Sequence, residues 1–459
     1  MAPSATQTNQ AAVPDTLPSK MKAPTVDPAQ AALDAAIERF TGRNQHSLEL
    51  HKLATESMPG GNTRTQLHTA PFPVCMKSGE GYQVTSEDGH TYTDFVGELT
   101  AGLYGHSHPV IKESIISVLN NVGINLGATI AQEHVHASGI CARFKLERVR
   151  FTNCGTEANL HALAAARAFT GKRKIVVFGG GYHGGCFTFA GGVPAPNNVD
   201  RDDWIVARYN DIDSAREAIK KEDVAAVLLE GMQGAPGAIQ ATSEFLKAIE
   251  ETAKEAGVIF ILDEVMTSRV APGGLASIYG LNPDLKSFGK YLGGGLAFGA
   301  FGGRADVMAV YDPRPGSKAT PTLQHHGTFN NNSLAMYAGH AGLSKIYPPE
   351  VCTEFNEVGN RLLDRLAEVT KGTKMCFSGI GTVFASHFTE AGLQTIEREG
   401  PEDWTLKELF WYEMMEDGFW ITRRGSIALV LGTPQEELDR FVDRVSAFLD
   451  RHESLVRIL

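Results

Sequence analysis

The amino-acid sequence predicts an α/β protein, in which a large domain with a mainly parallel sheet is joined to a smaller α+β domain. Short apolar runs alternate with amphipathic helices through the middle of the chain. A hairpin pattern precedes this region and long amphipathic helices follow it. A chain of 459 residues is also long enough to form more than one domain.

The N-terminal segment, residues 1–28, is rich in Ala, Pro, Ser, Thr and Gln and offers little to bury, so we expect a disordered tail. It contains Asp15 and no arginine, which leaves a mitochondrial transit peptide as the weaker alternative. It lacks the features of a secretory signal, and no apolar run is long enough to span a bilayer. We therefore expect a cytoplasmic protein with no membrane partner.

Residues 29–99 are predicted to form the N-terminal part of the small domain. The apolar spacing of residues 27–42 is typical of a helix, and Gly42 is a plausible stop. In "GYQVTSEDGHTYTDFVG", two alternating apolar runs flank Asp88-Gly89, which is a strong signal for a β-hairpin.

Residues 100–339 are predicted to form the large domain. Pro109 opens the helix "HPVIKESIISVLNNVG", and further helices are expected in "GTEANLHALAAARAFTG" and "SEFLKAIEETAKEAG". The strands expected between and after them are "RVRFTN", "KIVVFGG", "AAVLLEG", "VIFILDEV", "LKSFG" and "GAFGG". Their nearly unbroken apolar character indicates a parallel sheet covered on both faces.

Residues 340–459 are predicted to complete the small domain. Long amphipathic helices return here, with the short strands "GTVFASHF" and "SIALVL" between them. We expect these strands to share a sheet with the early hairpin.

The composition favours a small-molecule ligand. A net charge of −11 provides no basic footprint for nucleic acid or for an anionic membrane surface. The six cysteines have no CxxC spacing, so neither a metal site nor a disulfide framework is indicated.

Glycine-rich turns follow two of the predicted strands, where ligands of open parallel sheets bind. Gly155 and Thr156 begin a helix whose free N–H groups suit an anion, although ordinary capping explains them equally well. Gly179, Gly181 and Gly184 match the Rossmann pattern, but the sequence "CFTFAGGVPAPNN" that follows is unsuited to the long helix that this pattern requires. Tyr182 could instead place its ring against a flat cofactor.

Two charged residues complete a candidate site. Asp263 ends an apolar strand, where a carboxylate needs a positive partner unless it is merely a helix cap or a surface ion. Lys290 lies among glycines and apolar residues, which would lower the pKa of its amine and let it attack a carbonyl, although a solvated surface lysine is the better explanation when this residue is taken alone. With Tyr182 and the Gly155-Thr156 turn, these residues suit pyridoxal phosphate, as a Schiff-base lysine and a pyridinium partner.

The chain resembles the class III aminotransferases of PLP fold type I, from about residue 30 to its end. The motifs that carry this resemblance are "MPGGNTR", "YGHSHP", "TNCGTEAN", "GGYHGG", "LDEVMTSR", "GKYLGGGLAFGAFGGRADVM" and "HHGTFNNN", in family order. The branch is the one that holds glutamate-1-semialdehyde aminomutase and β-phenylalanine aminotransferase, and the similarity is greater to the second. The resemblance implies a large domain with a seven-stranded sheet and a homodimer with its sites at the interface.

The resemblance also implies roles for individual residues. Lys290 and Asp263 would be catalytic, and Arg64 and Arg424 would bind substrate carboxylates, for which a planar guanidinium is suited. Thr328 would reach the cofactor of the neighbouring subunit. The residues expected to bind pyridoxal 5'-phosphate are Cys154, Gly155, Thr156, Tyr182, His183, Glu230, Asp263, Val265, Lys290 and Thr328.

Several positions depart from the family pattern. Cys154 replaces a usual serine, Gly231 a usual proline, and Ser426 a bulkier residue, while "PGSKATPTLQHH" is longer than expected. The last two changes bear on the substrate pocket, so the preferred amine is the least determined feature.

The implied function is a ping-pong transamination through pyridoxamine phosphate. A β-phenylalanine-like β-amino acid or a related amine would be the donor, and pyruvate or 2-oxoglutarate the acceptor. The competing functions are an amine transaminase acting on amines without a carboxylate, a glutamate-1-semialdehyde 2,1-aminomutase, and a non-catalytic binding protein of the same fold. Loss of Lys290 or Asp263 would mark the last of these, and both are present.

Overall fold

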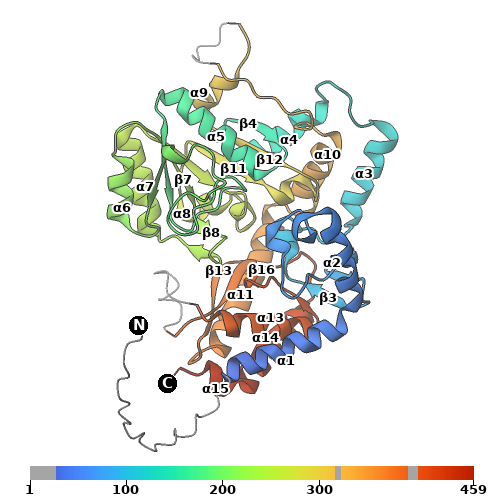
Figure 1. Ribbon diagram of the computed structural model, residues 1–459. Coiled ribbons are helices and arrows are strands. Elements are labelled where there is room, and N and C mark those ends of the chain that lie inside the picture. The colour runs from blue at the N-terminus through green and yellow to red at the C-terminus, as the bar shows by residue number, and fades with distance from the viewer. Residues whose placement is uncertain (1–26, 316–321, 391–401, 459) are drawn as a thin grey trace, which may run out of the picture.

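The computed structural model describes residues 27–315, 322–390 and 402–458 (Figure 1). The predicted tail lies outside the described residues except for its last two positions. Part of the insertion "PGSKATPTLQHH" also lies outside them. The predicted domain boundaries remain a prediction. None of the helices in the described ranges combines the length and the apolarity that crossing a bilayer requires.

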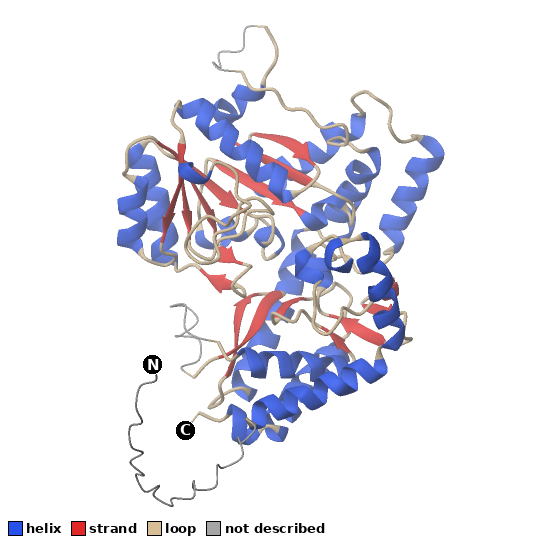
Figure 2. Cartoon of the chain, in the orientation of Figure 1, coloured by secondary structure: helices blue, strands red, loops and turns tan. Residues whose placement is uncertain are grey.

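A seven-stranded, mainly parallel sheet forms the centre of the large lobe, as predicted (Figure 2). β12 is antiparallel to both of its neighbours, and the other pairs in the sheet are parallel. The order is β4 (Arg148–Thr152), β12 (Gly299–Gly303), β11 (Leu285–Gly289), β10 (Ile259–Asp263), β7 (Val224–Glu230), β5 (Lys174–Phe178) and β6 (Trp204–Ala207). Of these strands, sequence patterns missed only β6, because this edge strand is partly exposed and its apolar run, WIVA, is only four residues long.

Both faces of this sheet are buried. Because successive side chains of a strand point to opposite sides, neighbouring residues of one strand belong to different cores. Ile175 and Val177 of β5 belong to the core formed with α5 (Gly155–Thr170). Val176 and Phe178 belong instead to the core formed with α6 (Ile212–Ile219) and α7 (Ser243–Ala256). This arrangement explains why the strands read as continuous apolar runs.

The smaller lobe contains two separate sheets, which corrects the prediction of one shared sheet. The hairpin forms as expected between β2 (Gln83–Ser86) and β3 (Thr91–Asp94), and its sheet includes β1 (Met76–Glu80) and β15 (Phe419–Trp420). β13 (Met375–Ile380), β14 (Val383–Phe388) and β16 (Ser426–Ala428) form the second sheet. β8 (Met232–Gln233) and β9 (Ile239–Gln240) pair separately beside the large sheet.

The remaining helices surround these sheets (Figure 1). The first helix, α1 (Pro28–Arg43), continues through Gly42 and ends at Arg43 with Asn44 as its C-cap, so the predicted glycine stop was wrong by one residue. α5 and α7 do end at glycines, Gly171 and Gly257, which cap the helices with left-handed backbone. The others are α2 (Gln45–Ser57), α3 (Pro109–Asn121), α4 (Ala131–Phe144), α8 (Leu275–Tyr279), α9 (Ala305–Met308), α10 (Ser333–Ala341), α11 (Pro349–Val369), α13 (Trp404–Glu416), α14 (Gln435–Arg451) and α15 (Glu453–Val456).

Candidate active site

One cavity of about 620 Å³ collects the residues that follow the central strands, together with segments of the smaller lobe. It lies at the carboxyl ends of β7, β10 and β11, the place where ligands of open parallel sheets bind. Nearly all of the residues predicted for the site line it: Arg64, Cys154, Gly155, Thr156, Tyr182, His183, Glu230, Asp263, Val265, Lys290 and Arg424.

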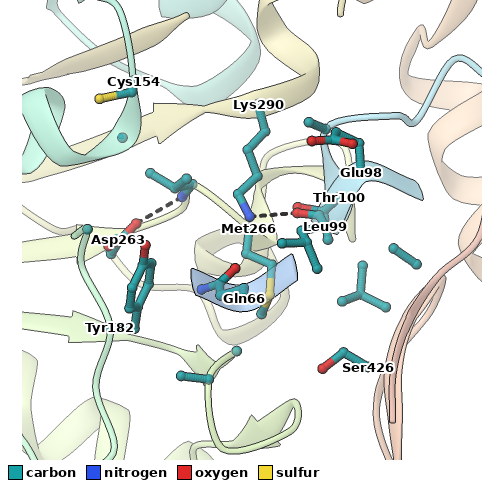
Figure 3. Close-up of a pocket in the computed structure, with 18 of the residues that line it drawn as sticks. Gln66, Glu98, Leu99, Thr100, Cys154, Tyr182, Asp263, Met266, Lys290 and Ser426 are labelled. Carbon is teal, nitrogen blue, oxygen red and sulfur yellow. Dashed lines mark hydrogen bonds between the residues drawn. The ribbon is translucent and has the colours of Figure 1, made fainter. Parts of the chain in front are cut away.

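Lys290 lies directly after β11 and projects into this cavity (Figure 3). Its backbone is left-handed, with φ of 58°, which is uncommon for a residue other than glycine and is one kind of strain that functional sites retain. Its Nζ donates a hydrogen bond of 2.6 Å to the carbonyl oxygen of Leu99. Burial lowers the pKa of Lys290 to about 8, although the charges of Asp263 and Glu230 act in the opposite direction. With this pKa, about a tenth of the amine is unprotonated at pH 7, far more than for an ordinary lysine, and this fraction is able to attack a carbonyl.

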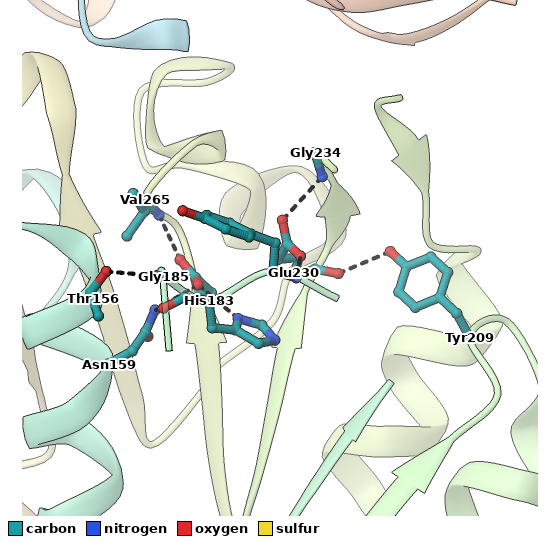
Figure 4. A network of polar contacts seen from close by, with 10 residues as sticks. Thr156, Asn159, His183, Gly185, Tyr209, Glu230, Gly234 and Val265 are labelled. Carbon is teal, nitrogen blue, oxygen red and sulfur yellow. Dashed lines mark hydrogen bonds and ion pairs between the residues drawn. The ribbon is translucent and has the colours of Figure 1, made fainter. Parts of the chain in front are cut away.

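Asp263 ends β10 as a buried carboxylate that receives several hydrogen bonds, and Figure 4 labels three residues that contact it, Asn159, His183 and Val265. Oδ2 accepts from Asn159 Nδ2 and lies against His183 Nδ1, each at 2.8 Å. Oδ1 accepts from the backbone N–H of Val265 at 3.0 Å. These contacts fix the carboxylate in one orientation, beside the cavity that also contains Lys290.

Tyr182 lies on a glycine-rich loop and not at the start of a helix. No helix follows within residues 185–200, so the structure excludes the Rossmann alternative. The loop is held by Glu230, whose two carboxylate oxygens accept from the backbone N–H groups of Tyr182 at 2.9 Å and Gly234 at 3.0 Å. Burial raises the pKa of Glu230 to about 7. Tyr182 lies beside Asp263 in Figure 3, and the residue is 38% exposed where it lines the cavity, so its ring is accessible to a flat ligand.

The start of α5 forms another part of the cavity lining, and Cys154 is the N-cap of this helix. The Cys154 side chain makes no capping hydrogen bond, so the N–H groups of the first turn remain available to an anion. A Cβ on Gly155 would lie 2.9 Å from the Val265 methyl groups. A Cβ on Gly184 would lie 2.3 Å from Thr156 Oγ1, and Gly184 has φ of 128°. Only glycine leaves this turn open to a ligand.

The two predicted carboxylate binders differ in their partners. Arg64 forms an ion pair with Glu98, and both side chains are about half exposed. Arg424 is partly buried, which lowers the pKa of its guanidinium, and among the described residues no carboxylate pairs with it. A partly buried guanidinium that lines a cavity without a carboxylate partner is suited to bind an anionic ligand.

Thr328 stands apart from the other predicted residues. It is exposed on a turn and does not line the cavity of its own chain. The neighbouring Asn330 accepts a hydrogen bond of 3.1 Å from Asn153, which precedes the N-cap of α5.

Asn159 and Glu98 also line the cavity, and the sequence patterns did not indicate either. Asn159 lies one helical turn after Gly155, so its contact with Asp263 could have been anticipated from helical spacing. Glu98 could not be identified as a site residue from the sequence, because nothing in its local sequence predicts its backbone conformation.

The lining fits pyridoxal 5'-phosphate. An aldehyde would meet the Lys290 amine, a pyridinium nitrogen would meet a carboxylate, and a phosphate would meet the glycine-lined start of α5. The charge of Asp263 would otherwise be buried beside only neutral donors and a histidine.

Comparisons with known proteins agree with this geometry. The family model for class III aminotransferases matches residues 65–192 and 190–449. An uncharacterized aminotransferase from Schizosaccharomyces pombe is 47% identical over 424 residues, which cover 92% of this chain and 95% of that protein. The β-phenylalanine transaminase of Variovorax paradoxus is 44% identical over 430 residues, covering 93% and 97%.

Two solved structures extend the comparison. The crystal structure of the Variovorax paradoxus β-phenylalanine aminotransferase matches with a TM-score of 0.90 and 43% identity, covering 94% of this chain and 99% of that one. A transaminase solved with PLP bound matches with a TM-score of 0.80 and 28% identity, covering 89% and 98%. The cofactor is pyridoxal 5'-phosphate. The chain belongs to the class III aminotransferase family and is a PLP-dependent transaminase of fold type I.

Proposed function

We propose that this transaminase moves the amino group of a β-amino acid with an aromatic or apolar side chain to a keto acid such as pyruvate or 2-oxoglutarate. The observation that carries the proposal is one cavity in which Lys290 and Asp263 lie together with two guanidinium groups, Arg64 and Arg424. The similarity to the Variovorax paradoxus β-phenylalanine transaminase supports the same substrate class.

The remaining lining suits an apolar side chain. Aliphatic, sulfur-containing and aromatic groups from both lobes face the cavity: Val96, Leu99, Met232, Ala238, Val383, Phe384 and Ile427. Ser426 lines the same cavity at the start of β16. A small residue at this position leaves room for a bulky donor, and its hydroxyl adds one polar contact.

Two sets of residues would hold the cofactor. The backbone of Gly155 and Thr156 would bind the phosphate, aided by Thr328 of the partner subunit in a homodimer, and Tyr182 would cover the ring. Cys154, His183, Glu230 and Val265 would support these contacts, since they position the first turn of α5, the Tyr182 loop and Asp263.

When bound, pyridoxal 5'-phosphate supplies an aldehyde for the substrate amine and a ring that accepts electrons. Lys290 would hold the cofactor covalently at rest and, once released, would move the proton at the substrate carbon as general base and acid. Asp263 would keep a proton on the ring nitrogen through its charge. Arg64 and Arg424 would orient the carboxylates of donor and acceptor.

The proposed homodimer is supported by apolar side chains that one chain leaves exposed on α3, on α5 and on the turn that carries Thr328. They are Ile116, Leu119, Leu160, Phe169 and Phe329. A subunit interface would bury apolar side chains of this kind.

A half-reaction screen tests the proposed substrate. Holoenzyme is mixed with each enantiomer of β-phenylalanine, with 1-phenylethylamine or with glutamate, without a keto acid, and the cofactor absorbance is followed. We expect one enantiomer of β-phenylalanine to bleach the band at the lowest concentration. Arg424→Gln should raise the KM for this donor by about 10- to 100-fold, the cost of losing a charge-assisted contact. Preference for 1-phenylethylamine would favour the carboxylate-free amine transaminase.

The same assay distinguishes a transaminase from an aminomutase and from a non-catalytic protein. An aminomutase would convert glutamate-1-semialdehyde with no keto acid present. In a non-catalytic protein, none of the donors would bleach the cofactor absorbance. Exposed Arg216→Gln on α6 serves as the matched charge control for Arg424→Gln, and no change in KM is expected for it.

Reconstitution of the apoenzyme should depend on pH through Lys290. The pKa of this amine is lowered to about 8, so the unprotonated fraction rises up to that pH and then saturates. Below pH 8 we expect the initial rate of covalent cofactor attachment to rise about tenfold per pH unit, with a plateau above it. Stopped-flow absorbance measures this rate. A rate that continued to rise toward pH 10 would contradict the lowered pKa.

A further inference from the structure

The segment that carries Glu98 forms a complete left-handed turn at the cavity. Gly97, Glu98, Leu99 and Thr100 have φ values of 49°, 46°, 53° and 79°. Three of these four residues carry a Cβ, and L-residues adopt this conformation singly and rarely in succession. Residues Glu98 to Ala101 line the same cavity as Lys290.

The turn is held at both of its ends by contacts outside it. Oδ1 of the buried Asp94 accepts from the backbone N–H groups of Val96 at 2.8 Å and Gly97 at 3.0 Å. The carbonyl oxygen of Thr100 accepts a longer contact of 3.5 Å from Arg269 Nη1. A Cβ on Gly97 would lie 2.6 Å from the carbonyl oxygen of Ala428, so the turn is also packed against the strand β16.

Strain that the surroundings maintain at a binding site indicates a function for the residues that it positions. The residue positioned here is Glu98, which Figure 3 places beside Leu99 and Thr100 at the cavity. Its carboxylate pairs with the Arg64 guanidinium, and both residues line the cavity. The side chains are 46% exposed for Arg64 and 55% for Glu98, so water screens the pair and the pairing is weak.

We propose that Glu98 is a specificity-determining residue, a displaceable internal carboxylate that occupies Arg64 until a substrate carboxylate replaces it. The inference rests on the proposed role of Arg64 in binding substrate. Because Arg64 stays paired when a donor has no carboxylate, such an amine binds without leaving an unpaired guanidinium. An acid, in contrast, must compete with Glu98. Arg424 has no such internal competitor among the described residues.

The test compares ligands that differ in their carboxylate. 3-Phenylpropanoate has a carboxylate and no amine, so its binding to holoenzyme is read from the cofactor spectrum as a dissociation constant. β-Phenylalanine and 1-phenylethylamine differ mainly in the carboxylate. The proteins are wild type, Glu98→Gln, Arg64→Gln and the double variant, with Glu113→Gln as the control for removal of an exposed charge.

We expect Glu98→Gln to lower the dissociation constant of 3-phenylpropanoate by about two- to fivefold, the range set by an exposed ion pair. The KM for β-phenylalanine should fall by a similar factor relative to the KM for 1-phenylethylamine, because only the first donor has a carboxylate that competes with Glu98. In the Arg64→Gln background the same change should have no effect, because the effect requires both partners.

Glu98→Gly provides a second variant, since glycine suits the left-handed backbone and removes the carboxylate without straining the turn. It should lower the dissociation constant of 3-phenylpropanoate by the same factor as Glu98→Gln. Unchanged or weaker binding of 3-phenylpropanoate in both variants would overturn the proposal, as would equal tightening without Arg64. Failure of the proposed function is distinguishable, because wild-type enzyme would then leave β-phenylalanine unreacted while 3-phenylpropanoate binding still reports on Glu98.

Discussion

Lys290→Ala is expected to lower transamination by at least about 10⁴-fold, because it removes the covalent attachment of the cofactor and the general base together. The variant should lose the visible absorbance of the lysine-bound cofactor while retaining its fold. Retention of the fold is expected because removing an amine with a lowered pKa relieves the burial of a charge. Absorbance spectra and steady-state turnover with an amine donor measure both effects.

Lys286 provides the matched control for this variant. It lies on the strand that leads to Lys290, is buried, and has a pKa lowered by burial, but its Nζ donates to the carbonyl oxygen of Phe144 at 3.0 Å. It does not line the cavity. Lys286→Met should therefore retain the absorbance and the turnover of the folded enzyme, even if its thermal stability changes. Turnover that survived in Lys290→Ala would contradict the assigned role.

Asp263→Asn is expected to lower kcat by roughly 10²- to 10³-fold, since a neutral amide cannot hold a proton on the ring nitrogen by its charge. Asparagine has nearly the same shape, so the cofactor should still bind and keep its covalent bond to Lys290. The expected signature is therefore loss of kcat with the absorbance band retained. Single-turnover kinetics of the donor half-reaction separate this effect from a change in binding.

The adjacent carboxylate distinguishes a catalytic from a structural effect. Glu264 is buried, but its oxygens accept from the backbone N–H groups of Leu275 and Ala276 at the start of α8. Glu264→Gln should lower the melting temperature and leave kcat of the folded protein unchanged. If Asp263→Asn behaved in the same way, the carboxylate at position 263 would have no catalytic part.

Much of the large lobe could be predicted from the sequence, because strands buried on both faces have a distinctive apolar pattern. "VIFILDEV" contains β10 and "LKSFG" is β11. The pairing of strands in the small lobe could not be predicted. The partner of the hairpin sheet is the two-residue strand Phe419–Trp420, whose pairing with β3 depends on long-range packing and not on a local pattern.

The site residues that follow apolar strands, Asp263 and Lys290, could also be predicted from the sequence. The two arginines are different, since nothing local distinguishes them from solvated loop arginines, and only the resemblance to a family indicated them. The left-handed turn at Glu98 lay beyond both approaches. Its conformation is imposed by Asp94, Arg269 and the neighbouring strand, and so it has no signature in its own residues.

The covalent bond between protein and cofactor can be located directly. Holoenzyme is treated with borohydride, which reduces that bond to a stable one, and the digested protein is mapped by mass spectrometry. We predict a single pyridoxyl group, on Lys290. A pyridoxyl group on another lysine, or none at all, would contradict the central claim that this cavity holds the cofactor through Lys290.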